Sequence, residues 1–179
     1  MGVDALRLKG KRVAVLVEDG FEDLEFWVPV MRLREEGADV IIAGLEGGKT
    51  YTGKTALKAS ADVTIDSLNA SELDALVVPG GWAPDKLRRY KRVKELLVEM
   101  NSQDKIIALI CHGGLVGISA GIVRGVKATG SEGIKDDLVN AGAIWTDEAA
   151  FRDKNFVWGR VVKDIPDFCR ELVKAVETI

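Results

Sequence analysis

A thiol and an imidazole stand side by side in the segment IIALICHGGLVGISAG, which covers residues 106–121. Apolar and small residues flank Cys111 and His112, which predicts a buried strand, a tight turn and a buried helix. A cysteine on such a turn is exposed above the sheet, like the nucleophile of a hydrolase elbow, and Gly113 and Gly114 give the chain room to turn. At a helix N-terminus the dipole is expected to lower the pKa of Cys111 and make it a nucleophile.

His112 is the only histidine in the chain, which makes it a candidate general base. Neighbouring side chains on a tight turn usually project in different directions, so we expect the imidazole to face another loop or another subunit. Two alternatives stay open: Cys111 as a small buried hydrophobic residue, and His112 as a structural residue. One histidine without a Cys-x-x-Cys motif argues against zinc, and no GxGxxG or Walker sequence is present. We therefore expect neither a metal nor a cofactor.

A carboxyl group and a glycine turn offer the remaining chemistry. Glu25 lies among apolar residues in the segment LEFWVP, which predicts partial burial, a raised pKa and an acid/base role; a surface glutamate is the alternative. In the Pro-Gly-Gly turn at residues 79–81, the backbone N–H of Gly81 could form an oxyanion hole with the amide of His112. The turn is also a common loop sequence. Trp82, which follows it, is expected to border the pocket.

Buried strands alternate with helical periods along the chain. Strands are predicted at residues 12–17, 39–43, 74–78, 105–110 and 126–129, with hairpins or edge strands at 48–66 and 151–158. Helices are predicted at residues 29–36, 84–100, 115–122, 134–141 and 166–178. This alternation predicts an α/β fold whose mainly parallel sheet is covered on both faces. The loops at 18–25, 79–85 and 111–114 follow strands, so we expect them to converge on one site.

Composition excludes several classes of protein. With 179 residues, 47% of them apolar, the chain is expected to form one domain spanning residues 1–179. A net charge of −3 with acids and bases mixed argues against a nucleic-acid partner, and no apolar run is long enough to span a membrane. Two cysteines make no disulfide framework, and Cys169 reads as a core residue. We expect a cytoplasmic protein.

These motifs together resemble the ThiJ/PfpI family, the superfamily that includes the parkinsonism-associated deglycase. The resemblance rests on GFEDLEFWVP, LVVPGGWAPD and ALICHGGLVGISAGIVRG and runs nearly end to end. It implies a flavodoxin-like three-layer sandwich with a nucleophile elbow, with Cys111 as nucleophile and Glu25 as its hydrogen-bonding acid. It also implies a homo-oligomer. In the PfpI branch the histidine meets an acid from a neighbouring subunit, and the matching position here is Asp85.

The chain departs from the family pattern at three places. Gly114 stands where the family usually has proline, and Asp85 is one methylene shorter than the usual glutamate. Near the C-terminus the usual Thr-Ser-Arg reads Trp-Gly-Arg at residues 158–160, and the Gly-Pro-Asp-Asp that follows it reads Val-Val-Lys-Asp at residues 161–164. These departures affect the wall of the pocket and the partner of the histidine, and with them the substrate.

Three functions are compatible with these residues. The leading hypothesis is a cofactor-independent glyoxalase or deglycase, in which Cys111 attacks a small 2-oxoaldehyde or its adduct and Glu25 moves the proton. The second is an intracellular cysteine peptidase or amidase that acts on peptides with Cys111, His112 and Asp85. The third is a redox-sensing stress protein or chaperone in which Cys111 is oxidised.

Overall fold

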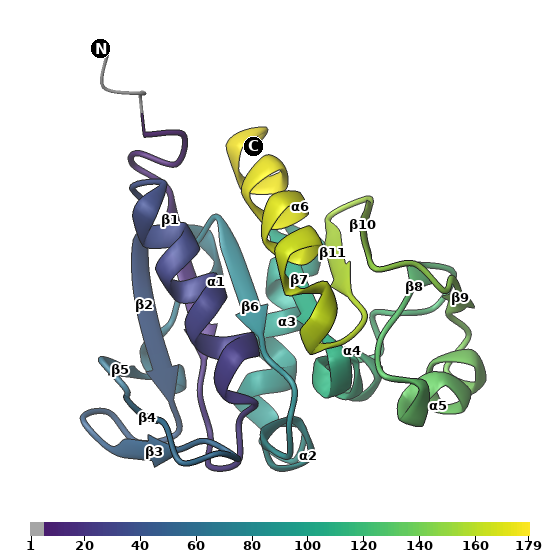
Figure 1. The fold of residues 1–179 in the computed structure, drawn as a ribbon, viewed down its shortest axis with the longest axis horizontal. Helices are drawn as coiled ribbons and strands as arrows, with labels where there is room; N and C mark the ends of the chain where they lie inside the picture. The colour runs from purple at the N-terminus through teal and green to yellow at the C-terminus, as the bar shows by residue number, and fades with distance from the viewer. Residues whose placement is uncertain (1–5) are drawn as a thin grey trace.

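The computed structural model describes residues 6–179 (Figure 1). Its centre is a seven-stranded sheet in the order β10-β11-β7-β6-β1-β2-β5. The neighbouring strands pair in parallel, except that β10 pairs antiparallel with β11 at the edge. The strands are β1 (Arg12–Leu16), β2 (Asp39–Gly44), β5 (Val63–Thr64), β6 (Ala75–Val78), β7 (Ile106–Ile110), β10 (Ala150–Asp153) and β11 (Phe156–Gly159). The predicted, mainly parallel sheet is therefore confirmed.

Helices cover both faces of the sheet and complete the three-layer α/β sandwich that the sequence predicts. In Figure 1, α1 and α6 lie in front of the sheet, while α3 and α4 lie behind it. The helices are α1 (Asp23–Glu35), α2 (Ala83–Leu87), α3 (Lys91–Ser102), α4 (Gly114–Ser119), α5 (Lys135–Asn140) and α6 (Ile165–Glu177). None of the helices within residues 6–179 combines the length and the apolar character that crossing a bilayer requires.

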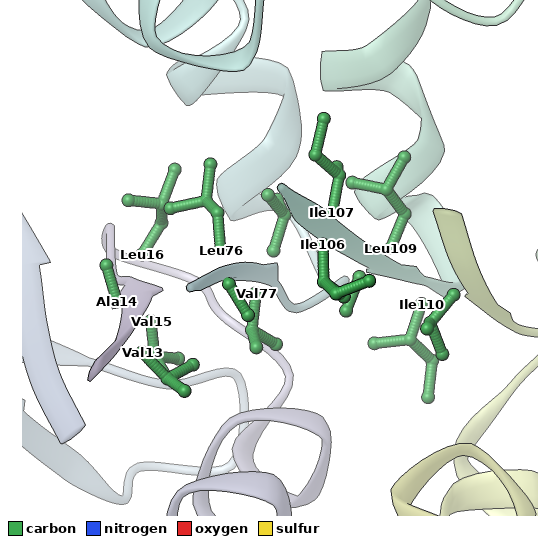
Figure 2. Close-up of a cluster of buried hydrophobic side chains, with 14 of the residues drawn as sticks. Val13, Ala14, Val15, Leu16, Leu76, Val77, Ile106, Ile107, Leu109 and Ile110 are labelled. Carbon is green, nitrogen blue, oxygen red and sulfur yellow. The ribbon is translucent and has the colours of Figure 1, made fainter. Parts of the chain in front are cut away.

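The central strands are apolar on both sides because both of their faces are covered. Figure 2 shows the side chains of β1, β6 and β7 alternating between the two faces, with Leu16 and Leu109 on one side and Val13, Val77 and Ile110 on the other. All five are fully buried. Since successive side chains of a strand point to opposite faces, an unbroken apolar run is what a doubly covered strand requires.

Two helix predictions need correction. The first helix begins at Asp23 rather than near Pro29, because the Glu22 side chain caps it by accepting from the backbone N–H groups of Leu24 and Glu25. Pro29 lies inside this helix, and Glu25 occupies its first turn instead of a loop.

The single helix predicted at residues 84–100 is two helices, α2 and α3, separated by residues 88–90. Leu87 and Val93 are both fully buried, yet six residues apart they would lie far from a common face of one continuous helix. The break turns both side chains toward the core.

Two small two-stranded sheets accompany the main sheet. β3 (Thr50–Thr52) and β4 (Lys58–Ser60) form the predicted hairpin, and β8 (Lys127–Ala128) pairs in parallel with β9 (Ile144–Trp145) in a separate sheet. The buried Asp23 carboxylate ties the tip of the first hairpin to α1 by accepting from the N–H groups of Thr55 at 2.9 Å and Leu57 at 2.8 Å. This anchor brings Lys54, at the same tip, to the carboxyl edge of the sheet.

Candidate active site

Three neighbouring strands place Glu25, Gly81, Cys111 and His112 around one cavity. Glu25 lies in the first turn of the helix after β1, Gly81 follows β6, and Cys111 directly follows β7. The cavity has a volume of about 470 Å³. Its lining residues are Glu22, Glu25, Lys54, Gly81, Trp82, Cys111, His112, Val161, Val162 and Lys163. The expected convergence on the carboxyl edge of the sheet is confirmed, and so is the expectation that Trp82 borders the pocket.

Cys111 sits on a strained turn, as a nucleophile elbow requires. Its φ angle is 57°, a left-handed conformation that a residue with a side chain adopts at an energetic cost. The chain passes so close to β6 at this turn that a Cβ on Gly113 would lie 2.4 Å from the carbonyl oxygen of Val78. Only glycine fits there, and this close packing fixes Cys111 at the carboxyl end of β7.

Glu25 is completely buried and is fixed by one strong contact. Its Oε2 atom accepts the backbone N–H of Gly80 at 2.8 Å, whereas Oε1 is buried without a hydrogen-bond partner among the described residues. A Cβ on Gly80 would lie 2.4 Å from Oε2 and 2.8 Å from Cβ of Cys111, so glycine is required for this approach. Burial and the nearby Glu22 carboxylate raise the pKa of Glu25 to about 7. The expectation of a buried carboxyl group with a raised pKa is confirmed.

The expected lowering of the Cys111 pKa is wrong. Burial and the adjacent Glu25 carboxylate raise the pKa of the thiol to about 12, against the opposing effect of the N–H groups of His112 and Gly81. α4 is only six residues long and follows a short 3₁₀ turn, so its dipole does not outweigh desolvation. The resting residue is a thiol, and its proton must leave as it attacks. The two N–H groups that face the sulfur are the pair predicted for the oxyanion hole.

Contrary to expectation, the ring of His112 lies beside the side chain of the preceding residue, Cys111. The Nδ1 atom lies 3.4 Å from Sγ of Cys111. Burial and the positive charge of Lys54 lower the pKa of His112, which keeps the ring neutral near pH 7. The other ring nitrogen, Nε2, faces the turn at Gly133. A neutral imidazole at this distance is able to accept the thiol proton.

Asp85 is not brought to the site within this chain. It lies in the first turn of α2, its side chain is exposed, and its carboxylate pairs with Arg89. Asp85 does not line the cavity. A contact between Asp85 and His112 of another subunit therefore stays a prediction.

Two of the departures from the family pattern, Gly114 and Trp158, lie side by side, and the large side chain of one fills the space beside the other. A Cβ on Gly114 would lie 3.0 Å from Cδ1 of Ile134 and 3.3 Å from the ring of Trp158. The fully buried Trp158 ring thus occupies the space beside Gly114, and neither residue lines the cavity.

Two parts of the cavity wall come from segments outside the three predicted loops. Lys54 comes from the β3–β4 hairpin and lies with its Nζ atom 5.3 Å from the centre of the Trp82 ring. Residues 161–163 come from the loop after β11. The departure from the family pattern at residues 161–164 points to the pocket wall, whereas no local motif near Lys54 predicts its place in the cavity, which depends on the anchoring of the hairpin by Asp23. Within residues 6–179, no cluster of three or more His, Cys, Asp or Glu side chains is arranged to hold a metal ion.

The fold and the site define an α/β protein in which a cysteine on a strand-to-helix turn and a buried glutamate line one cavity. The DJ-1/PfpI family profile matches residues 11–175. A deglycase from Pyrococcus horikoshii is 43% identical over 166 residues, which cover 93% of this chain and 99% of the relative. YraA of Bacillus subtilis, named as a candidate cysteine protease, is 40% identical over 161 residues, or 90% of this chain and 95% of the relative. The chain belongs to the DJ-1/PfpI family.

A solved structure agrees with this assignment. The two-domain protein of Anabaena variabilis, which contains DJ-1/ThiJ/PfpI-like and ferritin-like domains, superposes with a TM-score of 0.90 and is 39% identical. The match covers 92% of this chain and 47% of that one, so this chain spans about half of the two-domain protein.

Proposed function

We propose that this protein is a cofactor-independent glyoxalase or deglycase that acts on 2-oxoaldehydes and their early adducts. One observation carries the proposal: a fully buried Glu25 carboxyl group, with a pKa of about 7 and one oxygen that has no hydrogen-bond partner within residues 6–179, adjoins the Cys111 thiol. A group that changes protonation near neutral pH suits repeated transfer of one proton. The name of the deglycase from Pyrococcus horikoshii supports this choice.

The first step is addition of Cys111 to the aldehyde carbon. The sulfur forms a bond to that carbon as the thiol proton passes to Nδ1 of His112, 3.4 Å away, and then to the aldehyde oxygen, which gives a hemithioacetal. The N–H groups of Gly81 and His112, which face the sulfur, hold the developing oxyanion. With an early adduct, the sulfur displaces the amine or thiol from the same carbon, and the leaving group takes up the Cys111 thiol proton by way of His112.

The second step moves one proton between adjacent carbons. The Glu25 carboxylate removes the hydrogen from the carbon that bears sulfur, which gives an enediol, and returns a proton to the neighbouring carbon. The product is a thioester of a 2-hydroxy acid. Water then cleaves the thioester, which releases the hydroxy acid and restores the thiol, so no external oxidant or reductant is consumed.

A cysteine peptidase or amidase is the second candidate. The pairing of His112 with Cys111 favours it, as does the name of the relative from Bacillus subtilis. Amide hydrolysis also requires protonation of a poor leaving amine, and a third group usually orients the histidine for that purpose. Asp85 does not provide that group within this chain.

A panel of three proteins separates the candidates: the wild type, Cys111→Ala and His112→Ala. Methylglyoxal conversion that needs Cys111 and persists, at a reduced rate, without His112 supports the glyoxalase. Peptide cleavage that requires both residues, without methylglyoxal conversion, supports the peptidase. Rapid oxidation of Cys111 with neither activity contradicts both. Because this chemistry needs a free Cys111 thiol, we also place the protein in a reducing, cytoplasmic compartment.

A further inference from the structure

A second cleft adjoins the cavity that contains Cys111. It has a volume of about 290 Å³ and is lined by Gly130, Glu132, Lys135, Trp145, Asp147, Arg160, Val161 and Lys163. Val161 and Lys163 line both spaces. The second cleft lies between the lobe that carries α5 and β9 and the loop after β11. The two spaces therefore share a wall at Val161 and Lys163, which is where a longer substrate bound at Cys111 would pass from one to the other.

The cations of the second cleft differ in how far their charge is compensated. Arg160 is held by Asp147 at 2.8 Å and by Asp164 at 2.9 Å. Lys135 and Lys163 form no ion pair within residues 6–179. Glu132 is the one lining carboxylate without such a pair in the same range, and the Arg160 cluster contains two carboxylates for one cation. The cleft as a whole is therefore balanced in charge, and the unpaired ammonium groups of Lys135 and Lys163 are the positions in it that favour an anion.

The wall opposite the loop offers both a charged and an aromatic group, and so can contact a ligand that is larger than a single ion. The Nζ atom of Lys135 lies 5.7 Å from the centre of the Trp145 ring, so one ammonium group and one aromatic face are presented together. The two ion pairs of Arg160 fix the start of the loop that carries Val161 and Lys163. A ligand with a carboxylate and a short apolar stem matches this surface.

We propose that this second cleft is a substrate subsite that binds the carboxylate of an amino acid or peptide whose 2-oxoaldehyde adduct is bound at Cys111. The inference rests on the proposed function and narrows it, because it makes the adduct of a carboxylate-bearing amine or thiol the preferred substrate over the free aldehyde. The catalytic cavity alone, at about 470 Å³, has room for much more than an aldehyde as small as methylglyoxal. Lys163, at the junction of the two spaces, and Lys135, beyond it, hold the carboxylate.

The test compares two methylglyoxal hemithioacetals, one of N-acetylcysteinylglutamate and one of its fully amidated counterpart. Lys135→Gln removes a cation from the second cleft without touching the cavity at Cys111, and Lys127→Gln is the matched control, an exposed lysine on β8 of the same lobe. Lys135→Gln is expected to lower kcat/KM for the acidic adduct by about threefold to tenfold, through KM. Turnover of the amidated adduct and of methylglyoxal stays unchanged, as does every rate of the control.

Equal loss for the two adducts, or no loss for either, overturns the subsite. A second measurement is independent of catalysis: the indole N–H signal of Trp145, assigned with Trp145→Phe, is followed by NMR as unreactive N-acetylalanylglutamate or its diamide is added. A shift with the acid alone, weakened by Lys135→Gln, supports the subsite even if the wild type converts no aldehyde, in which case only the proposed function fails. Equal shifts with acid and diamide overturn it.

Discussion

The Oε2 atom of Glu25 accepts the backbone N–H of Gly80 at 2.8 Å inside the protein, while the second carboxyl oxygen is buried with no hydrogen-bond partner in the described part of the chain. One oxygen anchors the side chain and the other is available beside the Cys111 thiol. A carboxyl group that is held in place needs no reorientation before it transfers a proton to or from a bound substrate.

Replacing Glu25 by glutamine removes proton transfer by this side chain but leaves its position unchanged. The amide fills the same space, but it cannot accept a proton from carbon. We expect Glu25→Gln to lower kcat for methylglyoxal by about 100-fold or more, the usual contribution of a general base. Steady-state conversion to lactate checks this, with Glu35→Gln, at an exposed position of the same helix, as control. Wild-type turnover in Glu25→Gln would rule out the proposed mechanism.

The same substitution should make Cys111 easier to ionise. The Glu25 carboxylate is one cause of the raised pKa of the thiol, and glutamine carries no charge. We expect the rate of alkylation by iodoacetamide to rise with pH at lower pH values in Glu25→Gln than in the wild type. Mass spectrometry of the modified Cys111 peptide measures the rate, with the buried Cys169 as internal reference. An unchanged pH profile would show that the two groups do not interact.

The raised pKa of Glu25 also predicts how stability depends on pH. The pKa is about 7 in the folded protein and 4.5 ordinarily, so unfolding releases a proton between these values and the folded state loses stability as the pH rises. The full loss, about 3 kcal/mol, is present above pH 7 and absent below pH 4.5. Glu25→Gln should therefore be more stable than the wild type at pH 8 and equal to it at pH 4. Urea unfolding at both values tests this; a constant difference contradicts it.

Gly80 is expected to tolerate no side chain. A Cβ there would lie 2.4 Å from the Glu25 carboxyl and 2.8 Å from Cβ of Cys111, so Gly80→Ala must displace one of them. We expect a loss of about 1–3 kcal/mol in unfolding free energy together with most of the turnover. Gly133→Ala is the matched control, because its Cβ would have no neighbour closer than 3.7 Å. Equal effects of the two variants on thermal denaturation would show that crowding at Gly80 does not limit the fold.

Self-association should depend on the outer face of α1. Leu24, Val28 and Met31 lie on one side of this helix and are 47%, 38% and 63% exposed, an apolar stripe that a second copy of the chain would cover. We expect sedimentation at micromolar concentration to show an oligomer and Met31→Glu to shift it toward the monomer. Val98→Glu, on the exposed side of α3, is the control. A monomeric wild type would remove the proposal that Asp85 acts on a neighbouring subunit.

The sequence by itself determined the sheet and the main chemistry. The strands β1, β6 and β7 are unbroken apolar runs, and such runs fit only a doubly covered sheet. The turn after β7 and the apolar neighbours of Glu25 placed a thiol and a buried carboxyl group at the same edge. Both signals are local, because they depend on residues adjacent in the chain.

Only the tertiary structure decided the protonation of the site and the shape of its walls. The pKa of Cys111 follows from its burial and from Glu25, which is 86 positions away in the chain, so the local helix dipole gave the wrong sign. Lys54 reaches the cavity through the contacts of Asp23 with the hairpin, and Trp158 fills the space beside Gly114. Desolvation and packing depend on neighbours brought together by folding, and no local pattern of residues encodes them.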